Sequence, residues 1–429
     1  MNAPFVLTPQ HFGSLVFERH TSRFIPFDHE ATNVLRELAQ VSFYELMDRR
    51  SEDQHEQLEA FYESLDERGW FTADRRFAGV VNEVEQLPSN HLVGPLAVHL
   101  EIVGACNLTC THCFADPLPR NRELLTLSEY TNLFRELASM GSFRLGLTGG
   151  EPLMRRELLE VIDEATNAGL HPCLTTNGLL LDETWARELC KRELVWLNIS
   201  LDGASAATND AVRGKGTFDR VVRKLRELGH LFRFTLAFTV MKHNAHEVPA
   251  FAQLAKELGA ANVVFRPLYP AGAALHRLEL LPGFGQYSDA LLSLESHGSV
   301  RGIDPFSPMA RADANAVVYG NFGCGAGNSI ASISARGDVN PCSFLGTAFD
   351  AANVRDRSFR EIWNDSERFR AMRALSKKPS PGEFNGGCRA RSLRLAGDVN
   401  AADPWQAEWD ARRGQAVRPG FTLPVLSGS

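Results

Sequence analysis

Between residues 96 and 267 the chain alternates six times between a short apolar segment and an amphipathic one. We expect strands at residues 96–103, 143–147, 171–175, 195–199, 234–240 and 262–267. Strictly alternating strands and helices predict a parallel sheet. Six units fall short of the eight that close a barrel, so we expect an α/β fold built on a partial, TIM-like (β/α)6 barrel. In such barrels the chemistry lies at the carboxyl ends of the strands.

Helix-start signals fall between these apolar segments. Thr126 followed by Glu129 forms a capping box before the first long helix. Thr217 is expected to cap a later helix, and Asn244 with Glu247 the one after it. These signals support the division into strand and helix units.

The first expected strand runs into a loop that carries three cysteines. Cys106, Cys110 and Cys113 follow the spacing C-x3-C-x2-C, and we call them the cysteine loop. Thiolates are soft ligands that favour iron–sulfur clusters or zinc. A closed zinc site needs four ligands, and His112 is the one nearby residue that could supply the fourth. A cubane cluster with three protein ligands instead leaves one iron open.

This spacing resembles that of the radical SAM enzymes, in which the open iron chelates S-adenosylmethionine (SAM). The resemblance continues at the ends of later strands, with TGGEP at residues 148–152, TTNG at 175–178, ISLDG at 199–203 and NDAVRG at 209–214. It covers about residues 96–270. The partial barrel is also the fold of that family.

The resemblance assigns seven residues to cofactor binding: Gly149, Gly150, Glu151, Asn177, Ser200, Asp202 and Arg213. In the family the Gly-Gly-Glu motif receives the amine of SAM. Ser200 and Asp202 occupy positions that help to hold the ribose. Arg213 resembles the arginine that pairs with the SAM carboxylate, a task that suits the two parallel hydrogen bonds of a guanidinium.

The chemistry implied by the resemblance begins with an electron from a reduced [4Fe–4S] cluster, supplied by a donor such as flavodoxin or ferredoxin. SAM is cleaved, and the resulting 5′-deoxyadenosyl radical abstracts hydrogen from a substrate. That reactivity belongs to the cofactor, while the protein supplies position and excludes water. The sequence identifies no catalytic acid or base.

The first ninety residues read as a small winged-helix-like α+β domain. Residues 14–18 and 23–27 predict two strands, and Asp28 can cap a helix after them. Further helices are expected near residues 43–49 and 53–67. This pattern resembles the leader-binding domains of peptide-maturation systems, in which a precursor peptide adds a strand to the sheet. A decoration that serves packing alone remains the alternative.

The C-terminal third resembles the SPASM extension of radical SAM enzymes, which usually holds two auxiliary iron–sulfur clusters. Cys324, Cys342 and Cys388, here called the C-terminal trio, match three ligands of the first auxiliary cluster. The family's ligand positions for the second cluster hold other residues: Leu375, Lys378, Phe384 and Gln406. We therefore expect one auxiliary cluster with three thiolates. Three leftover thiols or a zinc site are the alternatives.

These readings divide the chain into four parts. We expect a leader-recognition-like domain at residues 1–92, the barrel at 93–275, a SPASM-like domain at 276–406 and a tail at 407–429. The middle of the chain resembles the mycofactocin and pyrroloquinoline quinone maturases, notably at residues 209–214. The leading hypothesis is thus an enzyme that modifies a ribosomally made precursor peptide.

Two other functions stay open. One is a radical SAM enzyme that acts on a small molecule or a tetrapyrrole. The other is a non-catalytic iron–sulfur or zinc protein, which the presence of Glu151 and Arg213 disfavours. Sulfatase maturation is disfavoured as well, because that subgroup has an aspartate where Ser343 follows Cys342.

Bulk properties exclude several partners. The 429 residues carry a formal net charge of -7 and a pI near 6.0, which argues against binding to nucleic-acid phosphates. No apolar run is long enough to span a bilayer, and the N-terminus lacks a signal-peptide layout. Eight cysteines in motif-like settings suit a reducing compartment. We therefore expect a cytoplasmic protein with no membrane partner.

Overall fold

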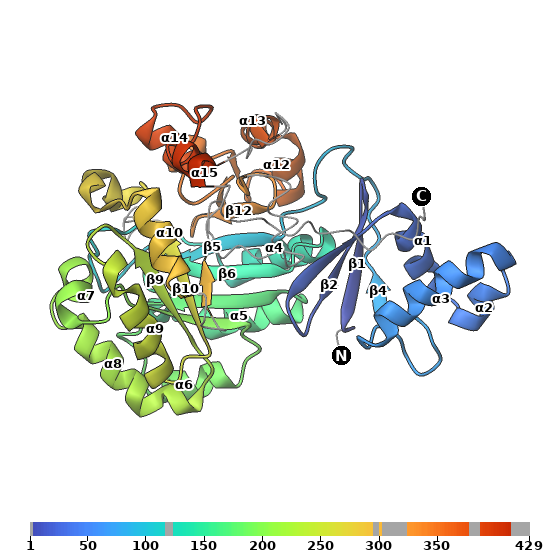
Figure 1. The fold of residues 1–429 in the computed structure, drawn as a ribbon, viewed down its shortest axis with the longest axis horizontal. Coiled ribbons are helices and arrows are strands. Elements are labelled where there is room, and N and C mark those ends of the chain that lie inside the picture. Colours follow the sequence, from blue (N-terminus) through green and yellow to red (C-terminus); the bar gives the residue numbers. More distant parts are fainter. Residues whose placement is uncertain (1–2, 116–122, 295–299, 303–323, 377–386, 413–429) are drawn as a thin grey trace.

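The computed structural model describes residues 3–115, 123–294, 300–302, 324–376 and 387–412. They form a four-stranded sheet with three helices, a ten-stranded sheet wrapped by helices, and a C-terminal group of short helices (Figure 1).

The N-terminal sheet has the order β3-β2-β1-β4. Its strands are β1 (Phe5–Gln10), β2 (Gly13–Glu18), β3 (Arg23–Phe27) and β4 (Gly79–Val81), and its helices are α1 (His29–Leu38), α2 (Phe43–Met47) and α3 (Glu52–Asp66). The two expected strands and the three helices are confirmed. Strands β1 and β4, which the sequence did not predict, complete the sheet on the far side of β2.

The six expected barrel strands are confirmed, with bounds within a few residues of the prediction. They are β5 (Ala97–Val103), β6 (Arg144–Gly149), β7 (His171–Thr176), β8 (Trp196–Ser200), β9 (Thr235–Val240) and β10 (Asn262–Pro267). All of them pair in parallel with their neighbours. The helices between and after them are α4 (Leu127–Ser139), α5 (Leu158–Asn167), α6 (Glu183–Cys190), α7 (Ala206–Arg213), α8 (Thr217–Leu228), α9 (Val248–Glu257) and α10 (Phe284–Leu292).

The sheet is wider than the six expected strands. β11 (Val300–Gly302) continues it beyond β10, and β12 (Ile330–Ile333) pairs in parallel with β5 at the other edge. β13 (Asp338–Asn340) and β14 (Ala352–Asn353) follow β12 in antiparallel order. The C-terminal extension is therefore joined to the barrel through backbone hydrogen bonds.

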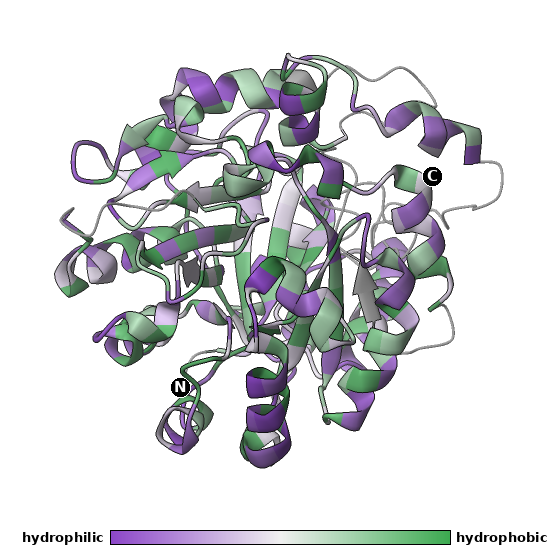
Figure 2. Cartoon of the chain, turned by 90° about the vertical axis from the view of Figure 1, so that its left-hand side faces the viewer, coloured by the Kyte–Doolittle hydropathy of each residue, from purple (hydrophilic) through white to green (hydrophobic). Residues whose placement is uncertain are grey.

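Five of the six barrel strands have one buried face and one half-buried face, whereas β9 is buried at every residue except Thr239. In β5, Val98 and Leu100 are buried and pack with the surrounding helices, whereas His99 and Glu101 on the other face are half-buried. This alternation follows from the two-residue repeat of a strand. The second set lines the inside of the half-barrel. Figure 2 views the molecule from the left of Figure 1 and shows the strands ringed by helices with hydrophilic outer faces.

The N-terminal sheet docks at the amino-terminal ends of the barrel strands. The ring of Phe17 stacks on Phe143, 4.8 Å between centroids, and meets His171 edge-on. Arg144, the first residue of β6, donates to the carbonyl of Ser22. Because Phe17 is fully buried within the same apolar cluster as the barrel strands, the two sheets share one core. The opposite face of the sheet packs on α1 to α3.

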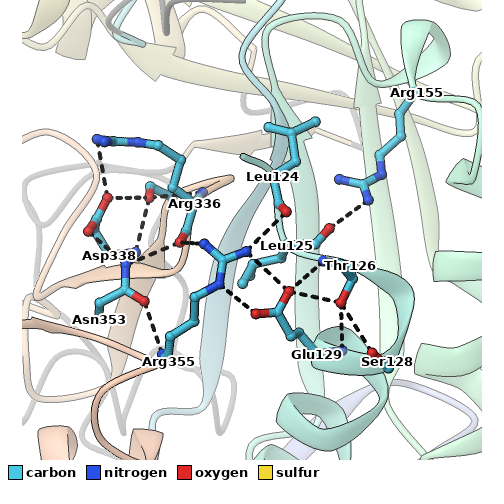
Figure 3. A network of polar contacts seen from close by, with 11 residues as sticks. Leu124, Leu125, Thr126, Ser128, Glu129, Arg155, Arg336, Asp338, Asn353 and Arg355 are labelled. Atoms are coloured by element: carbon cyan, nitrogen blue, oxygen red, sulfur yellow. Dashed lines mark hydrogen bonds and ion pairs between the residues drawn. The ribbon is translucent and has the colours of Figure 1, made fainter. Parts of the chain in front are cut away.

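The C-terminal region consists of α12 (Phe359–Asp365), α13 (Glu367–Ser376), α14 (Arg389–Leu395) and α15 (Gln406–Arg412) after the β12–β14 strands. Figure 3 shows how it joins the barrel. Arg355 donates to both oxygens of Glu129 and to the carbonyl of Leu124. Glu129 also completes the predicted capping box with Thr126. One capping residue thus serves both a helix start and a contact between regions.

Two predicted caps are wrong. Thr217 is the first residue of α8, and Gly216 in a left-handed conformation precedes it as the N-cap. The side chain of Asn244 accepts no capping hydrogen bond, and α9 begins at Val248 after a short turn at Ala245–Glu247. Other short turns of this kind are Pro152–Met154, Gly229–Leu231, Gly272–His276, Leu278–Leu280 and Thr347–Phe349. Among the described helices, none combines the length and apolar character that crossing a bilayer requires.

Candidate active site

The cysteine loop follows the carboxyl end of β5, where the barrel fold places its chemistry. The thiols of Cys106, Cys110 and Cys113 are half-buried and close enough to affect one another electrostatically. Burial raises the pKa of Cys110 to about 11, with the charge of Arg213 acting in the opposite direction. In the protein alone these sulfurs are thiols. Coordination by iron would remove their protons.

The surroundings of Cys106 fit an iron–sulfur cluster. The backbone N–H of Leu108 donates to the Cys106 sulfur at 3.4 Å, and the amide of Asn177 lies 3.9 Å from it. Such hydrogen bonds favour thiolates and tune iron–sulfur clusters. The described residues contain no group of three His, Cys, Asp or Glu side chains arranged around a single metal ion. His112, the candidate fourth ligand for zinc, lies 2.9 Å from the carboxylate of Asp202.

Gly149 and Gly150 lie against the backbone of the cysteine loop. A Cβ atom on Gly149 would stand 2.2 Å from the Val103 carbonyl oxygen, and one on Gly150 would stand 2.1 Å from that of Ala105. The N–H of Gly150 donates to the Val103 carbonyl at 2.7 Å. These glycines let the end of β6 approach the loop, because no side chain would fit between the two segments.

Glu151 is fully buried and joins the ends of two strands. Its Oε1 accepts from the hydroxyl of Thr176 at 2.6 Å, and its Oε2 accepts from the N–H of Asn177 at 2.8 Å. Burial raises the pKa of Glu151, while these hydrogen bonds oppose the shift. With both oxygens engaged, the carboxylate holds the β7 turn beside the cysteine loop.

Asn177 extends the same connection. Its side-chain N–H donates to Asn107 of the cysteine loop at 2.7 Å, and its oxygen accepts from the N–H of Leu179. Ser200 ends β8 on the half-buried inner face, and its hydroxyl makes no hydrogen bond with another described residue. The hydroxyl of Ser200 therefore remains available for a ligand.

Asp202 is the electrostatic centre of the site and is fully buried. Its Oδ2 accepts from Nε of Arg213 at 2.6 Å and lies 2.9 Å from Nε2 of His112, while its Oδ1 accepts from the N–H of Thr239. Burial alone would raise the pKa of Asp202. The charges of Arg213 and His112 outweigh it and hold that pKa far below its usual range. The carboxylate of Asp202 thereby orients Arg213 and His112.

Arg213 has one side engaged and one side available. Asp202 takes its Nε, and its two terminal nitrogens make no hydrogen bond with another described residue. The ion pair fixes the direction of the guanidinium near Cys110. An arginine held in this way can meet a carboxylate through its terminal nitrogens.

Two asparagines that the sequence did not assign to the site complete this centre. The side-chain oxygen of Asn209 accepts from the N–H of Asp202 at 3.0 Å. The side-chain N–H groups of Asn244 donate to the carbonyls of Asp202 and Thr239 at 2.9 Å. The sequence around Asn244 indicates a helix cap, and no local pattern signals that this residue joins the end of β8 to that of β9.

The C-terminal trio lies in a separate apolar cluster. Cys324 and Cys388 are buried there with Met372 and Leu345, and Cys342 packs against them. Burial raises the pKa of Cys342 to about 12, and the neighbouring thiol of Cys324 contributes in the same direction. The chain thus brings together the three cysteines that the sequence grouped.

The four positions expected to lack cluster ligands can be placed only in part. Gln406 begins α15, and its side chain donates to Asp410. Leu375 lies on α13, but the placement of its side chain is not described. Lys378 and Phe384 lie outside the described residues.

Comparison with family models identifies both regions. The radical SAM superfamily model matches residues 100–255, and an iron-sulfur cluster-binding domain called SPASM matches residues 324–389. Mycofactocin maturase MftC of Mycolicibacterium smegmatis is 33% identical over 334 residues, which cover 75% of this chain and 85% of that protein. The chain belongs to the radical SAM superfamily.

Other relatives of this radical SAM enzyme differ in their reactions. AdoMet-dependent heme synthase of Methanosarcina barkeri is 30% identical, over 72% of this chain and 96% of that protein. PqqA peptide cyclase of Xanthomonas campestris is 31% identical, over 72% of this chain and 86% of that protein. The maturase, the heme synthase and the peptide cyclase thus share 30–33% identity with this chain.

The solved structure of Streptococcus suis SuiB bound to its precursor peptide SuiA shares the fold. It covers 94% of this chain and 98% of its own, with a TM-score of 0.69 and 14% identity. The structure of anSMEcpe with bound AdoMet covers 75% of this chain and 93% of its own, with a TM-score of 0.58. Membership of the superfamily gives the radical SAM enzyme its cofactors, an iron–sulfur cluster with SAM and an auxiliary cluster in the SPASM region.

Proposed function

We propose that this radical SAM enzyme modifies a ribosomally synthesised precursor peptide and that its N-terminal sheet binds the leader part of that peptide. The maturase and peptide-cyclase relatives act on peptides by name. SuiB, whose fold extends over nearly the whole of this chain, was solved with a precursor peptide. These relatives support a peptide substrate.

The observation that carries the proposal is the outer edge of β3. This strand stands at the end of the N-terminal sheet and pairs on one side with β2. Among the described residues, no strand pairs with its other side. An unpaired edge offers backbone N–H and C=O groups to an added strand. α3 packs close by, because the Phe61 ring lies 6.2 Å from that of Phe27.

Each cysteine group has a place in this proposal. Cys106, Cys110 and Cys113 hold the cluster that binds SAM, and Cys324, Cys342 and Cys388 hold the auxiliary cluster. When bound and reduced, the first cluster supplies the electron that cleaves SAM to the 5′-deoxyadenosyl radical. Arg213 meets the carboxylate of SAM, and Ser200 remains available to its ribose. Glu151, Asn177 and Asp202 hold these groups in position.

A tetrapyrrole or another small molecule is the second candidate. The heme synthase relative supports it, since that protein is 30% identical and matched over 96% of its length. On this reading the N-terminal sheet stabilises the barrel and binds no peptide. The shared core of Phe17 and Phe143 is compatible with either role.

The test uses the whole protein, because deleting residues 1–92 would expose the apolar core that the barrel shares with the sheet. The enzyme is reconstituted with iron and sulfide under argon and reduced with dithionite or flavodoxin. It is then incubated with SAM and a short peptide encoded beside its gene. We expect 5′-deoxyadenosine and a mass change in the peptide.

Leader peptides with N-methylated backbones separate the two roles of the sheet. N-methylation removes the amide donors that an added strand needs and leaves the side chains unchanged. We expect the unmethylated leader to inhibit modification in competition and a leader methylated at alternate residues to inhibit at least about tenfold less. Equal inhibition by both leaders would contradict strand addition at β3. A mass change in a porphyrin and none in any peptide would favour the second candidate.

A further inference from the structure

Arg266 differs from the buried arginines of the described chain, because it is half-buried and its guanidinium has no protein partner there. The buried arginines donate to protein groups: Arg155 to the carbonyls of Ile102 and Leu125, Arg373 to those of Gly327 and Trp363, Arg389 to those of Val399 and Ala401, and Arg391 to the carboxylate of Asp403. The side chain of Arg266 makes no hydrogen bond or ion pair with another described residue. A half-buried guanidinium without a protein partner has its donors available for an anion.

Arg266 lies inside the half-barrel. It is on β10, where Phe265 and Pro267 are buried against the helices, so its side chain belongs to the half-buried inner face. Burial lowers the pKa of Arg266, and nearby acidic groups, Tyr269 and then Asp202, offset part of that shift. Asp202 is already engaged by Arg213, His112 and the N–H of Thr239.

Apart from Asp202, no described carboxylate is among the groups whose charge acts on Arg266. His99, on the inner face of β5, is close enough for the charge of Arg266 to affect it. Burial, and then that charge, lower the pKa of His99 to about 4, so this imidazole is neutral at pH 7. Its Nδ1 lies 3.3 Å from the hydroxyl of Ser343. Glu101, further along β5, lies on the side of Cys113 and raises the pKa of that thiol.

Tyr269, whose hydroxyl is near enough to affect the pKa of Arg266, belongs to a wall of aromatic rings. The ring of Tyr269 lies 4.5 Å from that of Phe344, and Phe344 meets Phe114 at 5.4 Å. Phe114 follows the cysteine loop, Phe344 follows Cys342, and Tyr269 follows β10. The wall is half-buried and connects the two cysteine groups. An apolar group carrying one negative charge would match both the wall and the guanidinium.

We propose that Arg266 binds a carboxylate of the substrate while the aromatic wall packs on the group that bears it. This inference rests on the proposed function and names the chemistry that the peptide must present, a C-terminal or side-chain carboxylate. One planar guanidinium beside a neutral imidazole suits a monovalent, planar anion. A phosphate would bring close to two charges and require more donors.

The probes are 3-phenylpropionate and its amide, which have the same ring and differ in charge. Their binding to the reconstituted holoenzyme with SAM is measured by equilibrium dialysis. We expect the wild type to prefer the carboxylate by at least about tenfold. Arg266→Gln should remove that preference and leave amide binding unchanged, and Arg266→Lys should keep part of it. Arg187→Gln on exposed α6 is the matched control.

SAM carries a carboxylate of its own, so its dissociation constant is measured in the same variants. We expect SAM binding by Arg266→Gln to stay within about twofold of the wild type. A tenfold loss would assign Arg266 to the cofactor and overturn the proposal. Absence of carboxylate preference in the wild type, or its survival in Arg266→Gln, would overturn it as well.

The outcome for the proposed function is read separately. If the wild type modifies its precursor peptide and Arg266→Gln does so equally well, this inference fails and the peptide-maturation proposal stands. If the carboxylate preference depends on Arg266 but no peptide is modified, the carboxylate site stands and the peptide proposal fails. Iron content and a melting temperature close to the wild type confirm that the variants are folded.

Discussion

The cysteine loop and the C-terminal trio differ in how the chain brings their thiols together. Cys106, Cys110 and Cys113 come from one loop and lie among charged and amide side chains that connect it to three strand ends. The C-terminal trio is collected from distant segments and lies in an apolar cluster with Met372. The first setting is open to a polar ligand, and the second is closed by packing.

This difference separates two tasks that one chain performs with the same chemical group. A ligand-binding cluster needs an approach for SAM and nearby residues to orient it, which the Asp202 centre provides. A cluster that binds no small molecule needs insulation, because burial and hydrogen bonding set its potential. The half-buried aromatic wall of Phe114 and Phe344 lies between the two regions.

The largest expected effect comes from the cysteine loop. Cys110→Ala should reduce SAM cleavage to background, because an incomplete ligand set cannot hold the open-iron cluster. Iron content should fall from about eight to about four per chain. The measurements are 5′-deoxyadenosine formation by chromatography and iron by colorimetry. Cys190→Ala, at an exposed cysteine, is the control and should change neither. Cleavage at the wild-type rate in Cys110→Ala would contradict the assignment of this loop.

Cys342→Ala should break the C-terminal trio without disabling the first cluster. We expect iron to fall again to about four per chain, while uncoupled SAM cleavage continues and peptide modification stops. The same chromatography and iron assays, with mass measurement of the peptide, distinguish this pattern from that of Cys110→Ala. A wild-type content of about four irons, unaffected by Cys342→Ala, would show that the trio holds no cluster.

Asp202→Asn tests the polar setting of the cysteine loop. The substitution keeps the shape but leaves Arg213 buried without its counter-charge. We expect a loss of about 3 kcal/mol in the free energy of unfolding and a higher KM for SAM. Denaturant titration and steady-state cleavage measure the two effects. Asp365→Asn, in an exposed ion pair with Arg370, should cost less than about 0.5 kcal/mol. Equal losses of unfolding free energy in the two variants would show that the Asp202–Arg213 ion pair contributes no more to stability than an exposed ion pair.

The smallest effect is expected where the C-terminal region meets the barrel (Figure 3). Hydrogen bonding from Arg355 is the largest cause that holds the pKa of Glu129 at about 2, below its ordinary 4.5. A carboxylate with a lowered pKa stabilises the folded state above the ordinary value. That contribution is lost as the pH falls from 4.5 toward 2. Arg355→Ala should lower stability by about 1 kcal/mol at pH 7, and its difference from the wild type should shrink toward pH 2. A constant difference would show that the ion pair is not the cause.

The barrel could be predicted because its signals are local. Each strand and each helix start is encoded within a few residues, as in the capping box of Thr126 and Glu129, which forms with both expected hydrogen bonds. β1 was missed because Phe5–Gln10 is buried throughout and shows no alternation. The pairing of β12 with β5 was missed because strand pairing between residues 330 and 97 leaves no signal in the local sequence around either residue.

The sequence predicted which residues gather in the site better than it predicted the hydrogen bonds and ion pairs among them. The motif residues do gather at the strand ends, but the sequence could not show that His112 and Arg213 share the carboxylate of Asp202. It also gave no sign that Asn244 donates to the backbone of two strands. Contacts of this kind depend on side chains that meet only after the barrel has formed.

Under the proposed function, the docking of the N-terminal sheet at the amino-terminal ends of the strands would set a minimum length of peptide between leader and reaction site. A leader bound on β3 would lie at one end of the barrel and the radical would form at the other, about 20 Å away for a six-residue strand. An extended chain covers at most about 3.5 Å per residue. The enzyme would therefore act as a ruler: residues closer than roughly six positions to the docked strand cannot reach the radical, whatever their chemistry.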